Sequence, residues 1–346
     1  MRVEWSDGSR GTMRVSVVVR TYTDARWDYL VRCISSIEAQ SRVPDEIVVV
    51  VDHNEPLYER VKKRFPTAAV VQNDEPAGSS GAWNSGIAAA SGDLLAFIDD
   101  DATAAPDWLE QLLEGYDDPA VVGVGGQIAP VWEDGRPGWF PEEFNWVVGS
   151  SYRGLSEGES RVRNLIGCNM SFRRRVFDAA GGFLGAESGI GHNGGSPIGC
   201  DETEFCIRVG QRWPKAIMLY RPQARVYHSV PARRATWQYF LARCQFEGRS
   251  KARVARLVGS QAGLETERAY ALTALPKGVA RGVGDLVLSR DPSGLARAGA
   301  IVAGLAWTAA GYLIEAVTPR PKGPARQEEE SVDADAGWDT VGEKSA

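Results

Sequence analysis

Continuous hydrophobic runs of strand length recur along the N-terminal part of the chain. The longer runs are RVSVVVR (14–20), EIVVVVD (46–52) and DLLAFI (93–98), and a shorter one covers Ala68–Gln72. Because hydrophobic residues in these runs largely follow one another instead of alternating with polar ones, they predict strands that are buried on both faces of a sheet.

Segments with helical patterns separate the predicted strands. Residues 27–40 place four apolar side chains on one helical face, namely Leu30, Cys33, Ile34 and Ile37. A second helical stretch continues through Arg64, and Gly78–Gly81 opens an Ala- and Gly-rich helix over Ala82–Ala90. Strands that alternate with helices in this way predict a parallel, doubly wound α/β sheet.

Aspartates follow three of the predicted strands. Asp24, Asp52 and the triplet Asp99–Asp101 each come just after a strand. Ligands of doubly wound sheets bind beyond the carboxyl ends of the strands. We therefore expect these carboxylates to lie at a ligand site.

The remainder of the chain is divided into a mixed region and a helical region. Residues 121–230 mix short strands with Trp-rich loops, and helices are predicted from Thr236 to Val317. The Gly-rich segment 185–199, which contains His192, is expected to form a mobile lid. The predicted boundaries are a flexible leader (1–12), a main domain (13–235), a helical extension (236–318), and a Pro-rich linker with a disordered acidic tail (319–346).

Composition and charge limit the class of protein. The chain has 346 residues, of which 43% are hydrophobic, and this excludes a disordered protein. Its net charge of −6 argues against a nucleic-acid partner. The charge is unevenly spread, with −9 over residues 1–227 (23 Lys+Arg against 32 Asp+Glu), +9 over 228–326 (15 against 6) and −6 over 327–346 (1 against 7). This reversal of sign indicates different roles for the parts of the chain.

The five cysteines and three histidines do not have the spacing of a usual zinc site. No two cysteines form a CxxC pair, and the histidines stand far apart. With no signal-peptide pattern at the N-terminus, we expect reduced thiols and a cytoplasmic protein.

The triplet Asp99–Asp101 points to metal chemistry. Adjacent carboxylates repel one another, so the cluster is unfavourable unless a cation neutralises it. Oxygen ligands favour Mg²⁺ or Mn²⁺, which is usually shared with a diphosphate. The alternative is an acidic loop in which an aspartate caps the helix expected over Pro106–Gly115. Its place after a buried parallel strand favours the metal.

Four segments in order resemble the inverting family 2 glycosyltransferases with the GT-A fold. They are VSVVVRTYTD, EIVVVVDHN, GSSGAWNSGIAAASGDLLAFIDDD and GCDETEFCIR, and the resemblance spans roughly residues 14–250. It implies a doubly wound mixed sheet, made of a Rossmann-like nucleotide-binding half and an acceptor half, with a C-terminal helical extension. EIVVVVDHN, GCDETEFCIR and the Trp-rich stretch PVWEDGRPGWFPEEFNWVVG are similar to the subset that includes glucosyl-dolichyl phosphate glucuronosyltransferases.

The resemblance assigns roles to the strand-end residues. It implies that the nucleotide-sugar contacts Thr21, Tyr22, Asp24, Asp52, Asn84, Asp99 and Asp100. It also implies a DXD motif formed by Asp99 and Asp101, with the metal at Asp101. In many GT-A enzymes a late histidine completes the metal shell, and this role would fall to His228, although a lone histidine is more often structural. His53 and His192 are given no such role.

The catalytic base is implied by the segment CDETE. Aligned with the family's acidic motif, the base falls on Glu202, whereas relatives usually have Asp at this position, and Asp201 remains an alternative. An inverting transfer needs such a carboxylate to accept the proton of the acceptor hydroxyl. The structural alternative is a capping box at a helix N-terminus, with Asp201 as the cap and Glu204 at the third position.

Two further residues depart from the family pattern. Trp83 stands beside Asn84 where many relatives have Arg-Asn, and Trp83 is expected either to stack on the nucleotide base or to pack against the sheet. Arg20 stands where Pro or Cys is frequent. Both departures weaken the inference of a uridine nucleotide.

The basic C-terminal part suggests contact with a membrane. Ala298–Val317 is about long enough to cross a bilayer, but it is rich in Ala and Gly and contains Glu315, so an interfacial or docked helix is expected instead. We therefore predict peripheral attachment of 236–318 to the inner face of the cytoplasmic membrane. Arg243 is the first candidate for a contact with the diphosphate.

The sequence thus predicts a metal-dependent transferase that moves a sugar, with inversion, from a nucleoside diphosphate to a hydroxyl acceptor. UDP-sugars, and UDP-glucuronate in particular, are the expected donors, and a lipid-linked (polyprenyl-phosphate-linked) sugar or a secondary metabolite is the expected acceptor. Two alternatives remain. A nucleotidyltransferase would need a Gly-rich basic loop after the first strand, where TYTDARWDY stands. A degenerate sugar-nucleotide-binding protein would fit the altered positions Trp83 and Glu202.

Overall fold

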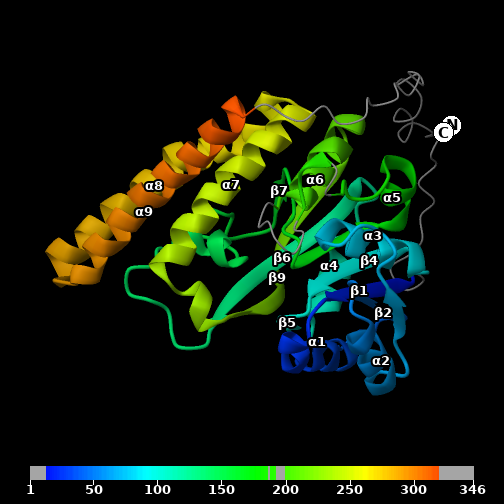
Figure 1. The fold of residues 1–346 in the computed structure, drawn as a ribbon. Helices are drawn as coiled ribbons and strands as arrows, with labels where there is room; N and C mark the ends of the chain where they lie inside the picture. Colours follow the sequence, from blue (N-terminus) through cyan, green and yellow to red (C-terminus); the bar gives the residue numbers. More distant parts are fainter. Residues whose placement is uncertain (1–12, 186–187, 192–198, 319–346) are drawn as a thin grey trace, which may run out of the picture.

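The computed structural model describes residues 13–185, 188–191 and 199–318 (Figure 1). Three predictions lie wholly or partly outside these residues, namely the leader 1–12, the segment 319–346, and the Gly-rich lid with His192. The rest of the chain forms one mixed sheet with helices on both faces and a long group of C-terminal helices beside it.

A mixed sheet organises the described part of the chain. Its strands are β1 (Val15–Thr21), β2 (Glu46–Val51), β3 (Ala69–Gln72), β4 (Leu94–Asp99), β5 (Ala102–Ala104), β6 (Val121–Trp132), β7 (Ser160–Val162), β8 (Asn169–Arg173) and β9 (Ile217–Val230). The strand order is β3-β2-β1-β4-β8-β6-β9-β5, and β7 pairs with β9. The first four strands in this order are parallel, and β8 then runs antiparallel to both β4 and β6. This topology confirms the doubly wound mixed sheet.

Helices cover both faces of the sheet and form the C-terminal extension. The α-helices are α1 (Trp27–Glu38), α2 (Glu55–Arg64), α3 (Ser79–Ala89), α4 (Trp108–Glu114), α5 (Arg174–Ala180), α6 (Asp201–Arg212), α7 (Trp237–Val258), α8 (Ser260–Ser289) and α9 (Pro292–Val317). Short 3₁₀ helices are η2 (Asp24–Arg26), η3 (Glu142–Val148) and η5 (Ala232–Arg234).

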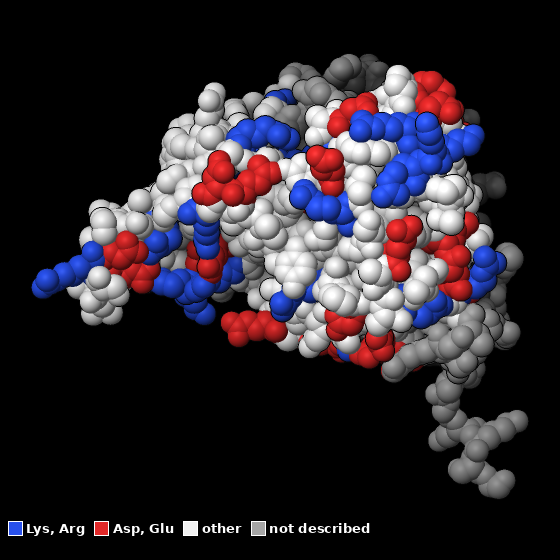
Figure 2. All heavy atoms as spheres, turned by 90° about the horizontal axis from the view of Figure 1, so that it is seen from below, with Lys and Arg blue, Asp and Glu red and all other residues white. Residues whose placement is uncertain are grey.

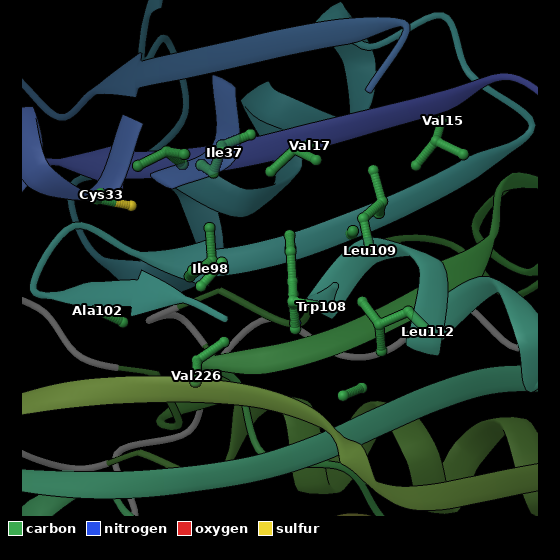
Figure 3. Close-up of a cluster of buried hydrophobic side chains, with 14 of the residues drawn as sticks. Val15, Val17, Cys33, Ile37, Ile98, Ala102, Trp108, Leu109, Leu112 and Val226 are labelled. Atoms are coloured by element: carbon green, nitrogen blue, oxygen red, sulfur yellow. The ribbon is translucent and has the colours of Figure 1, made fainter. Parts of the chain in front are cut away.

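Two hydrophobic cores hold the sheet between its helices. On one face, α1, α2 and α4 pack over the valines of β1 and β2, with Trp108 fully buried among them (Figure 3). The four apolar residues predicted for one face of α1 are all buried there. On the other face, α3, α5 and α6 enclose an aromatic cluster around Phe97. Both faces of the central strands are therefore buried, as their continuous hydrophobic runs predict.

The third helix begins earlier than the sequence pattern predicts. We expected it to start at Ala82, but α3 begins at Ser79. Gly78 precedes it with φ of +132°, a backbone conformation that favours glycine, and donates its N–H to Asp52 Oδ2 at 2.9 Å. The loop before α3 is thus bound to the end of β2, and Ser79 and Ser80 stand at the first turn of the helix.

The C-terminal helices α7, α8 and α9 run side by side as a long bundle next to the sheet (Figure 1). A Cβ on Gly248 would lie 1.9 Å from the carbonyl oxygen of Thr308, and one on Gly311 would lie 2.0 Å from that of Gln245. Both positions need glycine because any side chain would push α7 and α9 apart.

A buried carboxylate fixes the end of α9 on α7. Glu315 is 4% exposed and lies 3.0 Å from Arg249 Nε and 2.8 Å from Arg253 Nε. Among the described residues, α9 is the one helix that is long and apolar enough to cross a membrane. Its buried, paired Glu315 and its close packing on α7 agree with the docked helix that we expected.

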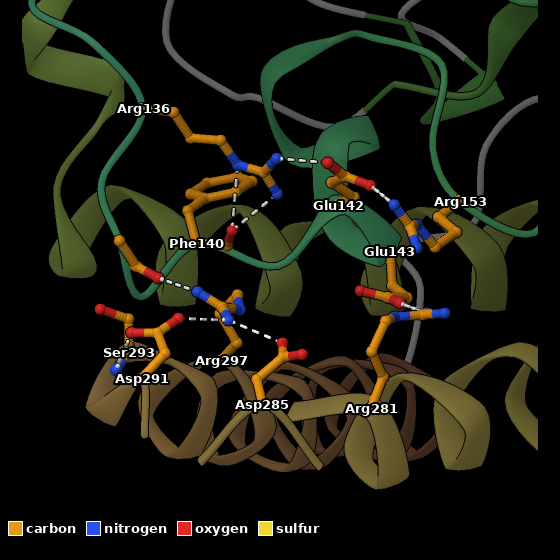
Figure 4. A network of polar contacts seen from close by, with 11 residues as sticks. Arg136, Phe140, Glu142, Glu143, Arg153, Arg281, Asp285, Asp291, Ser293 and Arg297 are labelled. Atoms are coloured by element: carbon orange, nitrogen blue, oxygen red, sulfur yellow. Dashed lines mark hydrogen bonds and ion pairs between the residues drawn. The ribbon is translucent and has the colours of Figure 1, made fainter. Parts of the chain in front are cut away.

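A polar network joins the extension to the loop after β6 (Figure 4). Arg297 of α9 contacts Asp285 and Asp291 at 2.8 and 2.9 Å, while Arg281 of α8 pairs with Glu143 of η3. Together with Arg136 and its neighbours, Glu143, Arg281, Asp285 and Arg297 line a cavity of about 300 Å³. The guanidinium groups of the network are matched by carboxylates, so the network holds the loop, η3 and the helices together.

Charges of both signs are interspersed on the face seen in Figure 2 and form no broad patch of a single sign there. The positive charge of residues 228–326 is partly neutralised within the fold. Arg249 and Arg253 pair with Glu315, and Lys251 pairs with Glu247 and Glu267.

Substitution of Gly311 tests the contact between α7 and α9. Overpacking a tight site typically costs 1–3 kcal/mol, so we expect Gly311→Ala to lower the free energy of unfolding by about 2 kcal/mol. Gly299→Ala is the matched control, because a Cβ at this exposed position of α9 meets no atom within 4 Å and alanine favours the helix by about 1 kcal/mol. Urea denaturation measures both values, and equal effects of the two substitutions would contradict the packing described.

Candidate active site

The aspartate triplet lies at the carboxyl end of β4, beside the end of β1. Asp99 is the last residue of β4, and the Arg20 guanidinium contacts its Oδ1 at 3.1 Å. Asp100 is buried and accepts a hydrogen bond of 2.8 Å from the Thr21 hydroxyl. Asp101, also buried, ends the short turn that leads into β5. The parallel register of β1 and β4 brings these residues to one edge, as the strand pattern predicts.

Cationic side chains compensate the triplet. Arg26 of η2 contacts Asp100 Oδ1 at 2.7 Å and Asp101 Oδ2 at 3.2 Å. Burial raises the pKa of Asp100 to about 6, and the charge of Asp101 adds to the rise while Arg26 opposes it. Burial also disfavours ionised Asp101, but His228 and Arg26 hold its pKa well below the usual range. Of the two carboxyls, Asp101 therefore loses its proton more readily.

His228 lies beside the triplet, although its strand, β9, is separated from β4 in the sheet by β8 and β6. It lies on β9 opposite Ala102 of β5, is 3% exposed, and places Nε2 3.2 Å from Asp101 Oδ1. Its Nδ1 is buried and has no hydrogen-bond partner among the described residues. Donor atoms of Asp99, Cys168 and His228 lie within 4.8 Å of one another. The oxygen and nitrogen donors around Asp101 fit a divalent cation such as Mn²⁺, which binds carboxylates and imidazole.

The second acidic group begins α6, and its local structure argues against the structural alternative given for it. That alternative was a capping box with Asp201 as the cap, but the cap position is Cys200, which makes no side-chain capping bond. Cys200 has φ of +74°, and Asp201 is the first helical residue. Glu204 turns away to pair with Arg208 at 2.9 Å. Asp201 and Glu202 are therefore not needed to cap the helix through a capping box.

Hydroxyl groups of α3 hold Asp201 in place. Ser79 and Ser80 donate to its Oδ2 at 2.8 and 3.0 Å. Burial raises the pKa of Glu202 well above its usual range, and the charge of Asp201 and a hydrogen bond with it act in the same direction. Asp201 thus has two hydroxyl donors that favour its anion, and Glu202 is the carboxyl whose pKa is raised by burial.

Two features bring the acidic groups into one site. The Arg20 guanidinium pairs with Asp99, and the charges of both Asp99 and Asp201 raise its pKa against the opposing effect of burial. The dipeptide Gly167-Cys168 lies between the groups: a Cβ on Gly167 would be 4.0 Å from the Glu202 carboxyl carbon, and Cys168 faces Asp99. The base candidates and the metal candidates therefore form one site.

The remaining residues that we predicted for the nucleotide lie near the ends of β1 and β2. Asp52 accepts hydrogen bonds from the Asn73 amide at 2.6 Å and from Gly78 N–H at 2.9 Å. Tyr22 is 51% exposed, and the Arg26 guanidinium lies 5.2 Å from its ring centroid. An exposed aromatic ring next to the triplet is available to stack on a base.

Asp24 and Asn84 are engaged by other parts of the protein. Asp24 pairs with Arg60 of α2 at 2.9 Å, and both side chains are about half exposed. The Asn84 amide donates to the Phe183 carbonyl at 2.9 Å and accepts from the Phe183 N–H at 2.9 Å. Asn84 thus ties α3 to the segment after α5, and its contact with a nucleotide remains a prediction, as does that of Asp24.

Trp83 was expected either to stack on the nucleotide base or to pack against the sheet, and the structure shows it packed against the sheet. It is 2% exposed and meets Phe97 edge-on with a centroid distance of 5.0 Å. The Arg20 guanidinium lies 4.5 Å from its ring centroid. Two of the departures from the family pattern, Arg20 and Trp83, are therefore partners: the ring supports the guanidinium that pairs with Asp99.

The sequence did not predict a buried ionic cluster that α7, α8 and Arg163 form next to α6. Lys251 of α7 lies 3.4 Å from Glu247 and 2.9 Å from Glu267 of α8, and Arg163 makes two bonds of 2.7 Å to Glu267. Neighbouring Glu247, Glu267 and Cys200 raise the pKa of Lys251 although burial opposes this. Only the Glu247–Lys251 spacing of four residues signals a pair in the sequence, because the other members come from distant elements.

Comparisons with known proteins identify the family. The family model described as Glycosyl transferase family 2 matches residues 16–181. A protein of Haloferax volcanii called glucosyl-dolichyl phosphate glucuronosyltransferase is 37% identical over 314 residues, which span 89% of this chain and 97% of the relative. The chain is a family 2 glycosyltransferase.

Two further matches extend the comparison. The succinoglycan biosynthesis protein ExoM of Rhizobium meliloti is 27% identical over 253 residues, which cover 70% of this chain and 75% of that protein. A solved mannosyltransferase of Pyrobaculum calidifontis, in complex with GDP-Man and Mn²⁺, has a TM-score of 0.53 at 17% identity, covering 86% and 87% of the two chains. This likeness confirms the GT-A fold of the family 2 glycosyltransferase described here.

Proposed function

We propose that this glycosyltransferase moves a sugar from a nucleoside diphosphate sugar to a hydroxyl acceptor, using a divalent cation and the two acidic groups of the site. The observation that carries the proposal is the convergence of Asp101 and His228 with the Asp201–Glu202 pair at one end of the sheet. One group has an ionised carboxylate for a cation, and the other has a carboxyl of raised pKa for a proton.

The donor end of the site is assigned to the edge formed by β1, β2 and β4. Thr21, Tyr22, Asp52 and Asp100 would receive the nucleotide, with Tyr22 exposed to meet its base. We propose UDP-glucuronate as the donor, because the relative of 37% identity is called a glucuronosyltransferase. The alternative of a GDP-sugar is an outcome of the donor comparison below.

The cation is assigned to Asp101, Asp99 and His228. Such an ion, Mn²⁺ or Mg²⁺, would act as a Lewis acid on the departing diphosphate, whose leaving oxygen gains negative charge. The site supports this assignment through the ionised Asp101 and the imidazole beside it. Arg26, which neutralises Asp100 and Asp101, supplies further positive charge at the same place.

Glu202 is assigned the role of the base. In an inverting transfer the acceptor oxygen attacks the anomeric carbon opposite the leaving diphosphate, and a carboxylate removes the hydroxyl proton. A base works best when its pKa is close to the working pH, and burial next to Asp201 shifts Glu202 in that direction. Asp201 would then orient Glu202 and remain an anion through Ser79 and Ser80.

The acceptor is proposed to be a polyprenyl-phosphate-linked sugar presented at a membrane surface. The Haloferax volcanii relative is named for a dolichyl phosphate substrate. Helices α8 and α9 expose large apolar side chains, among them Val287 (69%), Leu288 (85%) and Leu313 (63%). These residues suit a helix pair that lies on the inner face of the cytoplasmic membrane with α7 holding it to the enzyme.

Three variants test the roles in the site. We expect Asp101→Asn and Glu202→Gln each to lower kcat by about 10²–10⁴-fold, because each removes a charge or a proton acceptor that acts in the transition state. The measurement is release of nucleoside diphosphate with Mn²⁺, with UDP-glucuronate, UDP-glucose and GDP-mannose compared as donors. Glu110→Gln, an exposed carboxylate of α4, is the control and should retain full activity. Turnover that survives both site substitutions would overturn the assignment.

The pH dependence distinguishes Glu202 from Asp201. Because the base must lose its proton, a raised pKa moves the rising limb of kcat/KM to higher pH than for an ordinary glutamate. Asp201→Asn removes a charge that raises the pKa of Glu202, so the limb should shift to lower pH in this variant. If Asp201 were the base, the same variant would instead lose nearly all activity at every pH.

Vesicle binding tests the membrane surface. Burying a Val or Leu side chain is worth about 1.5–3 kcal/mol, so we expect Val287→Gln with Leu288→Gln to weaken binding to lipid vesicles at least tenfold. Val43→Gln, an exposed residue after α1, is the control. Co-sedimentation with anionic and zwitterionic vesicles measures the affinity. If the wild type, the Val287/Leu288 double variant and Val43→Gln bound vesicles equally, a membrane contact through the C-terminal end of α8 would be contradicted.

A further inference from the structure

The thiol of Cys168 faces the proposed metal ligands from a buried position. Cys168 is 4% exposed, and its sulfur belongs to the group in which the donor atoms of Asp99, Cys168 and His228 lie within 4.8 Å of one another. The Nδ1 atom of His228, itself buried, has no hydrogen-bond partner within the described residues. Two side chains with lone pairs thus converge on a carboxylate of the triplet.

The backbone around Cys168 is held by its neighbour in the sequence. Asn169, at the start of β8, donates through its amide to the carbonyls of Gln127 at 3.0 Å and Ala224 at 2.8 Å, and its oxygen accepts from Trp108 Nε1 at 2.8 Å. Asn169 is fully buried. The position of Cys168 is therefore held by contacts of its neighbour to β6, β9 and α4.

We propose that Cys168 is a ligand of the divalent cation, so that the site combines sulfur, nitrogen and oxygen donors. This inference rests on the proposed function, which assigns the cation to Asp101, Asp99 and His228. Binding would convert the thiol into a metal-bound thiolate, and the proton would pass to solvent. No electron is transferred in this step.

A sulfur donor changes which metals the site prefers. Thiolates select softer ions such as Cd²⁺, Co²⁺ and Zn²⁺, whereas Mg²⁺ is bound almost entirely by oxygen. Asp99, Asp101 and His228 alone would make a site of oxygen and nitrogen donors suited to Mg²⁺ or Mn²⁺. With Cys168 added, the order of affinity should be Cd²⁺ above Mn²⁺ and Mn²⁺ above Mg²⁺.

Cys33 provides a matched control. It is a second buried cysteine near the triplet, on α1, and its thiol donates to the Asp99 carbonyl at 3.5 Å. Its sulfur does not belong to the convergent donor group among the described residues. Replacement of Cys33 therefore removes a thiol of similar burial without removing a proposed ligand.

Titration with metal alone, in the absence of any donor sugar, tests the proposal. We expect Co²⁺ to produce a near-ultraviolet sulfur-to-cobalt charge-transfer band in the wild type and in Cys33→Ser, and to produce none in Cys168→Ser. We expect Cd²⁺ affinity, measured by calorimetry, to fall at least about tenfold in Cys168→Ser while Mg²⁺ affinity changes less than about threefold. Cys168→Asp, which replaces sulfur by oxygen, should shift the preference from Cd²⁺ towards Mg²⁺.

The outcomes separate this inference from the proposed function. A charge-transfer band that persists in Cys168→Ser, or a Cd²⁺ affinity that does not change, would overturn the sulfur ligand even if the enzyme transfers sugar. Loss of the band on replacing Cys168 supports the ligand even if no donor is turned over. Thermal unfolding without metal checks that Cys168→Ser folds, and Cys168→Ala gives a second test if the serine variant does not.

Discussion

The repulsion between neighbouring buried carboxylates is the constraint around which the site is built. Asp100 and Asp101 are almost wholly buried, and like charges at this distance disfavour ionisation of both. The fold answers with side chains from three directions: the guanidinium groups of Arg26 from η2 and Arg20 from β1, and the imidazole of His228 from β9. A divalent cation fits the same electrostatic requirement, so the arrangement that stabilises the fold also prepares the metal site.

The topology of the sheet explains why these groups meet. Parallel β1 and β4 bring their carboxyl ends to one edge, and the long strand β9 pairs with both β6 and β5 and so carries His228 across to Asp101. The antiparallel strand β8 starts at the same edge, which places Gly167 and Cys168 between the metal candidates and Glu202.

The C-terminal extension is linked to the site through ionic contacts and close backbone packing. Glycines let α7 and α9 touch, Glu315 joins them by ion pairs, and Lys251 extends from α7 to the region behind Cys200. Helix α7 joins the two parts because it contacts both α6 and α9.

The sequence by itself determined the elements and the edge of the sheet where the candidate site lies. Buried strands and amphipathic helices follow from periodicity, which is a local property, so β1, β2, β4 and α1 were predicted closely, and the strand-end aspartates with them. Only the tertiary structure decided the partners of those groups. The pairing of Arg20 with Trp83, the cap at Cys200 in place of Asp201, the approach of Cys168 and the cluster around Lys251 join residues far apart in the chain or depend on one backbone angle. Hydrophobic periodicity carries no information about such contacts, because they arise when separate elements pack together.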